Sequence, residues 1–229
     1  MIRFNKLNTL KPFDWLLITG IIAANLIYSV QMGEFDVIGS IAGITGVACV
    51  VLVAKGNILN YFFGVINVSL YALVAFKAQL YGDAALNALY YLPMQFIGWY
   101  SWIGKRQEET SVTVDARRLS AMQRVRLLVL SLATVAITAY VLHLFKDPQP
   151  LKDAATTVLS VIAMFLMVRR FMEQWVLWVV VNVISVVMWV YALASGESHS
   201  ALMVIMWLFY LANSINGWVT WNRLSKSRQ

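Results

Sequence analysis

Long apolar stretches, separated by short polar segments, run along almost the whole chain. Each stretch is close to the roughly 20 residues that a helix needs to cross about 30 Å of hydrocarbon. The stretches are too long and too uniformly apolar to be strands of a membrane barrel. The pattern therefore predicts eight transmembrane helices, at approximately 14–32, 36–54, 57–79, 83–103, 127–145, 151–169, 173–195 and 199–222.

Composition agrees with this all-α integral membrane fold. Hydrophobic residues make up 60% of the 229-residue chain and charged residues only 13%, which is about half the share found in soluble domains. The length allows one bundle of about eight spans. Cys49 is the single cysteine, so an intrachain disulfide is excluded.

The basic residues indicate how the bundle lies in the membrane. The N-terminus, Lys55, the 104–126 loop, the Arg169–Arg170 pair and the C-terminus hold all but three of the 18 lysines and arginines. By the positive-inside rule these segments are cytoplasmic, and so are both termini. We expect an integral membrane protein whose net charge of +7 orients the chain rather than binding nucleic acid.

Two pairs of similar segments point to an internal repeat. YLPMQFIGWYSW at 91–102 matches YLANSINGWVTW at 210–221, with an offset of 119 residues and GW-x-x-W at the end of both. NYFFGVIN at 60–67 matches WVLWVVVN at 175–182 with an offset of 115. The second match predicts three equivalent pairs: Asn60 with Trp175, Phe63 with Trp178, and Asn67 with Asn182.

The repeat predicts a 1+3+1+3 arrangement of helices. Residues 1–35 hold a cytoplasmic segment and an extra helix, and 36–103 form the first three-helix repeat. Residues 104–150 hold a cytoplasmic loop and a linker helix, and 151–229 form the second repeat with a tail. The linker lets the two repeats run parallel, and transporters place substrate near the midplane between such repeats.

Amides and aromatic rings supply the candidate binding residues. Trp178 and Asn182 are the strongest, because both lie too deep for the aromatic belt at the membrane surface. Indoles stack on flat or cationic rings, and amides pair with hydroxyls and carboxamides. We expect a small, flat, uncharged or singly cationic solute with several hydroxyls. The candidates are Asn60, Phe63, Asn67, Tyr91, Gln95, Trp99, Trp175, Trp178, Asn182, Asn213 and, more weakly, Asn216.

Several candidates have a purely structural alternative. Trp175 could belong to the aromatic belt, and Trp99 could face lipid. Asn67 or Gln95 could form hydrogen bonds between helices, and Gly98 could permit close helix packing. These alternatives remain open at the level of sequence.

No Asp, Glu, Lys, Arg or His lies in the middle of a predicted span, and His143 and His199 fall at helix ends. Ion-coupled carriers usually need an ionisable group or an oxygen cage inside the membrane. The pattern therefore favours uncoupled, facilitated diffusion. We expect no enzymatic activity, no metal and no cofactor.

The motifs together resemble the PnuC family of bacterial vitamin transporters. The resemblance rests on W-x-x-W-x-x-x-N in WVLWVVVN, on N-x-x-x-G-W in NSINGW, and on LYGDAALNALYYLPMQFIGWYSW at 80–102, where Gln95 takes the QF-x-GW position. It implies a fold related to the SWEET and SemiSWEET sugar transporters. It also implies uptake of nicotinamide riboside by facilitated diffusion, with a cytoplasmic kinase trapping the riboside.

The family name does not fix the vitamin, because similar members move thiamine or riboflavin. A membrane receptor that binds the vitamin without moving it is a further alternative, and self-association into a homo-oligomer is left open. Pro93 removes the normal hydrogen-bond partner of the Leu89 carbonyl and is a candidate hinge, with a static kink as the alternative.

Overall fold

The computed structural model describes residues 10–32, 37–77, 81–103, 114–147, 149–196 and 200–225, and within these ranges all regular elements are helices. The predicted all-α fold is thereby confirmed. The elements are α1 (Pro12–Met32), α2 (Val37–Ala54), α3 (Asn60–Lys77), α4 (Tyr81–Ala85), the π-helix η2 (Leu86–Tyr91), α5 (Leu92–Ile103), α6 (Ala121–Leu144), α7 (Pro150–Val168), α8 (Gln174–Ala194) and α9 (Ser200–Leu224).

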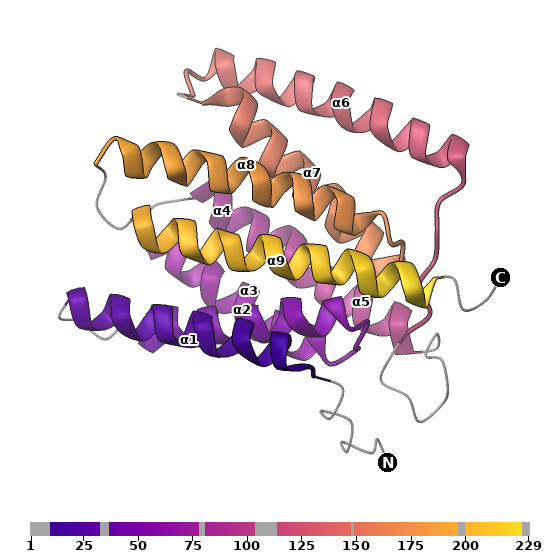
Figure 1. Cartoon of the computed structure of the whole chain (residues 1–229). Coiled ribbons are helices and arrows are strands. Elements are labelled where there is room, and N and C mark those ends of the chain that lie inside the picture. Colours follow the sequence, from indigo (N-terminus) through magenta and orange to yellow (C-terminus); the bar gives the residue numbers. More distant parts are fainter. Residues whose placement is uncertain are drawn as a thin grey trace. The chain divides into compact units, whose positions relative to one another are not determined.

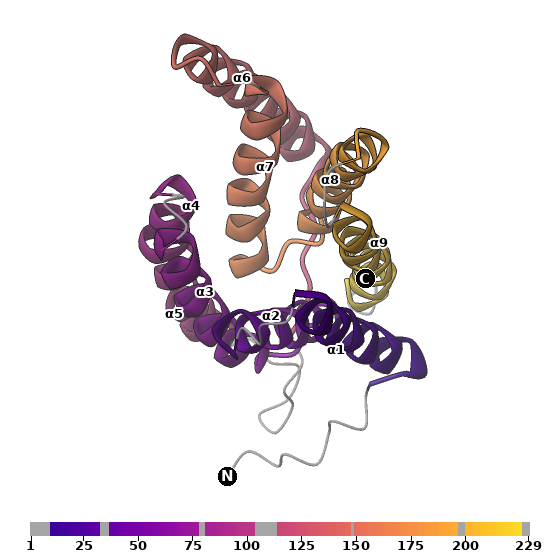
Figure 2. The same cartoon turned by 90° about the vertical axis from the view of Figure 1, so that its left-hand side faces the viewer.

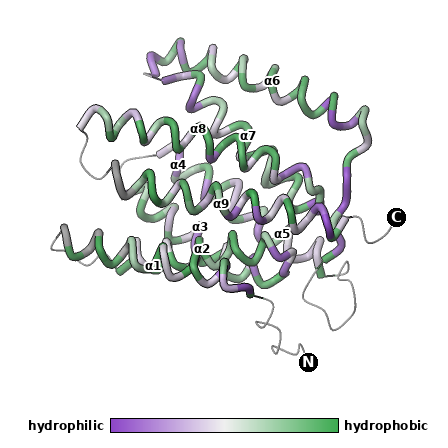
Figure 3. The backbone as a smooth tube through the Cα atoms, viewed as in Figure 1, coloured by the Kyte–Doolittle hydropathy of each residue, from purple (hydrophilic) through white to green (hydrophobic). Residues whose placement is uncertain are grey.

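Five of the described helices are long and apolar enough to cross a membrane by length and composition: α2, α3, α6, α7 and α8. Helix α1 contributes a shorter apolar stretch, Pro12–Ala24. In Figure 3 the hydrophobic colour dominates these helices, whereas the segment that leads into α6 is hydrophilic. These features are those of a multi-pass membrane protein.

The chain divides into two compact units, Met1–Asp115 and Ala116–Gln229. In the first unit α2 packs against α1 and α3, and α3 packs against α4, η2 and α5. In the second unit α7 packs against α6 and α8, and α8 packs against α9. Helices α8 and α9 lie side by side in both views of the chain (Figures 1 and 2).

The predicted helix at 83–103 is present, but a π-helical stretch interrupts it. Residues 81–103 are helical throughout, as α4, η2 and α5 in succession. The Leu92 N–H donates to the carbonyl of Asn87, five residues back, immediately before Pro93. A wider turn suits this place because proline has no N–H and its ring crowds the preceding turn.

The turns α2–α3 and α7–α8 have the same hydrogen-bond pattern. Asn57 N donates to Leu52 O at 2.9 Å, and Phe171 N donates to Leu166 O at 2.9 Å. The residue before each donor has a φ of 63°. The two turns are 114 residues apart, so the predicted offset of 115 is wrong by one residue.

The corrected offset changes which residues are equivalent. Asn60, the first residue of α3, corresponds to Gln174, the first residue of α8. Tyr61 therefore corresponds to Trp175, and the predicted pairs of Asn60 with Trp175, Phe63 with Trp178 and Asn67 with Asn182 do not hold. One residue turns a helix by about 100°, so the change moves every pair to a different face.

Helix α6 begins six residues earlier than the predicted start at 127. The Ser120 hydroxyl accepts from Gln123 N at 3.3 Å, and the Gln123 side chain accepts from Ser120 N at 2.9 Å. This capping box satisfies two of the free N–H groups at the helix start and allows a polar first turn.

Candidate functional site

Helices α8 and α9 pack together where an aromatic ring of α8 lies against a glycine of α9. The Trp175 indole is 2% exposed and lies against Gly217, where an added Cβ would come within 2.5 Å of the ring. Trp221 meets the same ring edge-on, with 6.2 Å between the ring centroids. Trp175 is therefore a packed residue of the second unit, and its surroundings differ from those of an aromatic residue in the membrane-surface belt.

The first unit repeats this arrangement with a tyrosine. Tyr61 of α3 lies against Gly98 of α5, and Trp102 meets it edge-on at 5.0 Å between centroids. Gly98 and Trp102 lie 119 residues before Gly217 and Trp221, as the second sequence match predicts. This equivalence confirms that match and supports the 114-residue offset on the preceding helix.

About two turns further along α8 than Trp175, an amide joins α8 to α9. The Asn182 Nδ2 group donates to the Ser214 hydroxyl oxygen at 2.7 Å. Asn182 is 4% exposed and Ser214 is also buried. The bond holds the amide in one orientation, a condition for recognising a solute through it.

Trp178 lies on α8 between the two buried residues and is only partly buried. It is four residues from Asn182, so the two side chains project within about 40° of each other. The α8 face thus presents a partly accessible indole beside a fixed amide. On α9, Asn213 is buried and Asn216 is partly buried.

Gln95 is the counterpart candidate in the first unit. It is 4% exposed, and its side-chain oxygen lies against Gly64 of α3. An added Cβ at Gly64 would also come within 3.2 Å of the Cys49 sulfur. Among the described residues, the Gln95 Oε1 atom has no hydrogen-bond partner. A buried amide with a free acceptor is suited to a polar ligand group.

The amides of two other predicted site residues form hydrogen bonds to backbone carbonyls of the first unit. Asn60 is fully buried, and its amide donates to the carbonyl of Asn57 at 2.7 Å. Asn67 donates from α3 to the Ala42 carbonyl of α2 at 2.8 Å. This is the hydrogen bond between helices that was the structural alternative for Asn67. Both amide groups thus have a structural function in the first unit.

Three aromatic candidates of the first unit are partly buried: Phe63, Tyr91 and Trp99. Phe63 meets Phe62 edge-on, and Tyr91 meets Tyr90 in the same way. Trp99 is on the same helix as Gln95, one turn later.

The sequence analysis missed Ser214 and Gln174. Ser214 accepts a hydrogen bond from Asn182, but nothing in the sequence sets the register between α8 and α9. Gln174 is fully buried, and neither of its side-chain polar atoms has a partner within the described part of the chain. The dipeptides Asn60–Tyr61 and Gln174–Trp175, each an amide followed by an aromatic residue, are the signal that could have revealed it.

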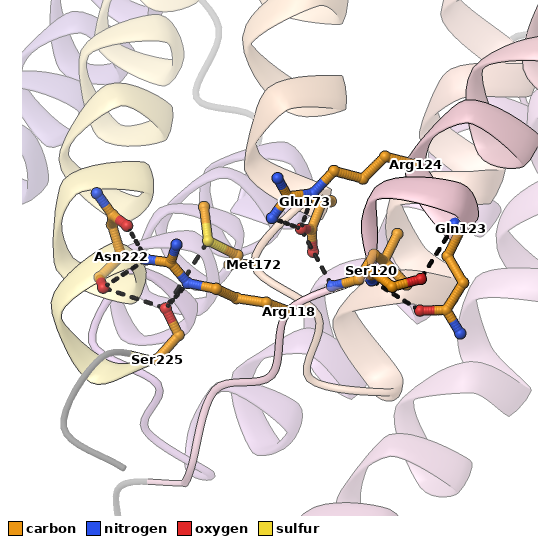
Figure 4. A network of polar contacts seen from close by, with 9 residues as sticks. Arg118, Ser120, Gln123, Arg124, Met172, Glu173, Asn222 and Ser225 are labelled. Carbon is orange, nitrogen blue, oxygen red and sulfur yellow. Dashed lines mark hydrogen bonds and ion pairs between the residues drawn. The ribbon is translucent and has the colours of Figure 1, made fainter. Parts of the chain in front are cut away.

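Charged groups gather at helix ends in both units. In the first unit Lys55 pairs with the fully buried Asp14 at 2.7 Å. In the second unit Glu173 pairs with Arg124 at 2.9 Å and accepts from Leu119 N (Figure 4).

A second group in Figure 4 ties the segment before α6 to the end of α9. Arg118 donates to the Ser225 hydroxyl at 2.7 Å and to the carbonyl and side-chain oxygens of Asn222. These contacts stabilise the second unit at its helix ends. The described residues contain no cluster of three His, Cys, Asp or Glu side chains that could hold a metal ion.

Comparison with known proteins agrees with the motifs. Residues 36–223 match the model of the nicotinamide mononucleotide transporter family. The chain belongs to this family. The predicted resemblance to PnuC transporters is thereby confirmed.

Individual relatives cover most of the chain. The nicotinamide riboside transporter PnuC of Neisseria mucosa is 38% identical over 192 residues, which are 82% of this chain and 73% of that protein. The protein of the same name in Haemophilus influenzae is 32% identical over 217 residues, which are 94% of this chain and 92% of that protein. A crystal structure of the vitamin B3 transporter PnuC has a TM-score of 0.78 and 32% identity, and the match covers 96% of this chain and 94% of that one.

Proposed function

We propose that this protein carries nicotinamide riboside into the cell. The α8 face carries the proposal: Trp178 offers an indole to the pyridinium ring, and the fixed amide of Asn182 offers a hydrogen bond. Two relatives named as nicotinamide riboside transporters match most of the chain and support the same solute.

The chemistry of the candidate residues favours the riboside over the mononucleotide. Amides, hydroxyls and indoles suit a carboxamide, a ribose and a cationic ring. A phosphate is usually held by arginine, lysine or a helix N-terminus. The ion pairs Lys55–Asp14 and Arg124–Glu173 and the hydrogen bonds of Arg118 lie at helix ends, whereas Asn182 and Gln95 lie inside α8 and α5.

Four side chains are proposed to contact the solute most directly: Trp178, Asn182, Gln95 and Asn213. The first is partly buried and the other three are buried amides. Phe63, Tyr91, Trp99, Trp175 and Asn216 are proposed to shape the site around them. Asn60 is proposed to act by holding the turn before α3, and Asn67 by holding α3 to α2.

The transport mode is proposed to be facilitated diffusion with alternating access. None of the candidate residues is an Asp, Glu, Lys, Arg or His, the usual groups that couple a solute to a proton or sodium ion. Net uptake then requires a sink, which a cytoplasmic kinase provides by phosphorylating the riboside.

We further propose a 1+3+1+3 arrangement with both termini in the cytoplasm. The equivalent turns α2–α3 and α7–α8 support two related three-helix sets. The basic residues Lys55, Arg118, Arg124, Arg169 and Arg170 cluster at these turns and at the start of α6, which supports the orientation.

Flux of labelled nicotinamide riboside into sealed vesicles that contain the purified protein tests the proposal. Saturable uptake that excess unlabelled riboside abolishes, and that thiamine and riboflavin leave unchanged, is the expected result. Uptake inhibited by thiamine or riboflavin instead would assign the protein to another vitamin. Saturable binding without flux would make it a receptor.

A further inference from the structure

The hydrogen bond between Asn182 and Ser214 determines which end of the amide is free. Nδ2 donates to the Ser214 hydroxyl at 2.7 Å. The two polar atoms of an asparagine side chain diverge by about 120° from one carbon, so Oδ1 points away from Ser214. One of the two N–H groups of Nδ2 is engaged by Ser214, and the bond turns Oδ1 away from Ser214. A solute on the Oδ1 side of the amide therefore meets an acceptor.

We infer that Ser214 is a positioning residue that makes the site selective for a carboxamide. In this proposal the Asn182 Oδ1 atom accepts from the carboxamide N–H of the pyridinium solute. A carboxylate at the same place offers only acceptors and would face the Oδ1 lone pairs. The inference rests on the proposed function and specifies the substrate class of the same site.

The position of Trp178 brings the two groups into reach of one solute. It lies four residues before Asn182, about 6 Å along the axis of α8 and nearly on the same face. A ring stacked on this indole carries its carboxamide at its edge. In the proposed pose the ring is turned so that this edge lies on the Asn182 side of the indole.

The first unit has no equivalent of this pair. By the structural offsets, Val68 of α3 corresponds to Asn182, and Gln95 of α5 corresponds to Ser214. Val68 is apolar, and Gln95 has its Oε1 against Gly64. At these equivalent positions, only the second unit has a hydrogen bond between an amide and a serine. A solute with one carboxamide needs only one such group, so a difference between the two units is expected.

The test compares two ligands that differ in one group, nicotinamide riboside and nicotinic acid riboside. Their affinities for the purified full-length protein are measured by intrinsic tryptophan fluorescence, and the ratio of the two dissociation constants is the readout. We expect the wild-type protein to prefer the carboxamide by about tenfold or more. In Ser214→Ala we expect the ratio to fall below about threefold, because the amide is then free to turn its NH₂ group toward a carboxylate.

Two controls separate orientation from loss of a buried hydroxyl. Ser214→Thr keeps the hydroxyl and is expected to keep the wild-type ratio. Ser131→Ala removes a buried hydroxyl from α6 that has no partner among the described residues, and it is also expected to keep the ratio. Because the readout is a ratio, a general loss of affinity or stability does not imitate the effect.

A second variant tests the inference if Ser214→Ala does not fold. Asn182→Asp keeps an acceptor toward the solute, and the Ser214 hydroxyl donates to its other oxygen. It is expected to bind nicotinamide riboside within about fivefold of wild type, whereas Asn182→Leu loses at least about tenfold. Loss of binding in Asn182→Asp as large as in Asn182→Leu would overturn the inference, since Nδ2 would then be the group that faces the solute.

The outcomes also separate this inference from the proposed function. Wild-type binding of the riboside together with an unchanged ratio in Ser214→Ala would refute the positioning role and leave the function standing. Equal binding of both ligands by the wild-type protein would also refute the positioning role and leave the function standing. Failure of the wild-type protein to bind or transport the riboside would refute the function, and the inference with it.

Discussion

Replacing Gly217 by alanine tests the packing that holds Trp175 in the second unit. An alanine Cβ would lie 2.5 Å from the Cη2 and Cζ3 atoms of the Trp175 ring and 2.6 Å from Cε3. Ordinary carbon contacts are about 3.5–4.0 Å, so the ring or the helix has to move by about 1 Å. Trp221, which is fully buried, meets the ring edge-on and limits its movement.

The expected cost follows from this crowding. Forcing a methyl group into a packed contact costs about 1–3 kcal/mol. For a protein of this size each kcal/mol lowers the melting temperature by about 2–4 °C, so we expect a decrease of about 2–12 °C. The measurement is thermal unfolding of the purified protein in detergent, followed by tryptophan fluorescence.

Gly82→Ala is the matched control. Gly82 lies in α4, and an added Cβ there meets nothing within 4 Å among the described atoms. Alanine is a better helix former, so this variant is expected to melt at the wild-type temperature or slightly above it. Equal stability of Gly217→Ala and Gly82→Ala would refute the close contact of Gly217 with Trp175.

Three further substitutions address the site, the helix ends and the hinge. Trp178→Ala is expected to weaken riboside binding by about 1–3 kcal/mol through lost stacking, measured by calorimetric titration; wild-type affinity in a folded variant would remove Trp178 from the site. Arg118→Ala removes bonds to Asn222 and Ser225 and is expected to lower stability by about 1–2 kcal/mol in thermal unfolding, with unchanged riboside affinity; an unchanged melting temperature would show that these bonds contribute nothing. Pro93→Ala is expected to slow vesicle uptake without changing affinity, because alanine restores a helix N–H beside η2; an unchanged rate and temperature dependence would leave Pro93 a static kink.

The helices could be predicted from the sequence because the length of an apolar run is set by the thickness of the membrane. The predicted span 151–169 and helix α7, Pro150–Val168, differ by one residue at each end. The start of α6 was missed because its first turns are polar and read as a loop. Its signal, Ser120 with Gln123 three residues later, was nevertheless present.

The register of the repeat and the pairing of the site residues were harder to predict. A match by residue type aligned Asn67 with Asn182, but the turn before each helix sets the register one residue away. Trp178 and Asn182 could be placed on one face from helix geometry alone. The contact of Asn182 with Ser214 depends on the axial register between α8 and α9. Helical periodicity within one helix carries no information on the register between two helices.

Uptake by the purified protein in proteoliposomes tests the central claim most directly. Labelled nicotinamide riboside is offered outside, with and without a riboside kinase and ATP inside. The account predicts saturable entry that stops at equal concentrations without the kinase and continues to accumulate label with it. Absence of saturable entry by a protein that binds the riboside, or accumulation above the outside concentration without the kinase, would contradict transport by facilitated diffusion.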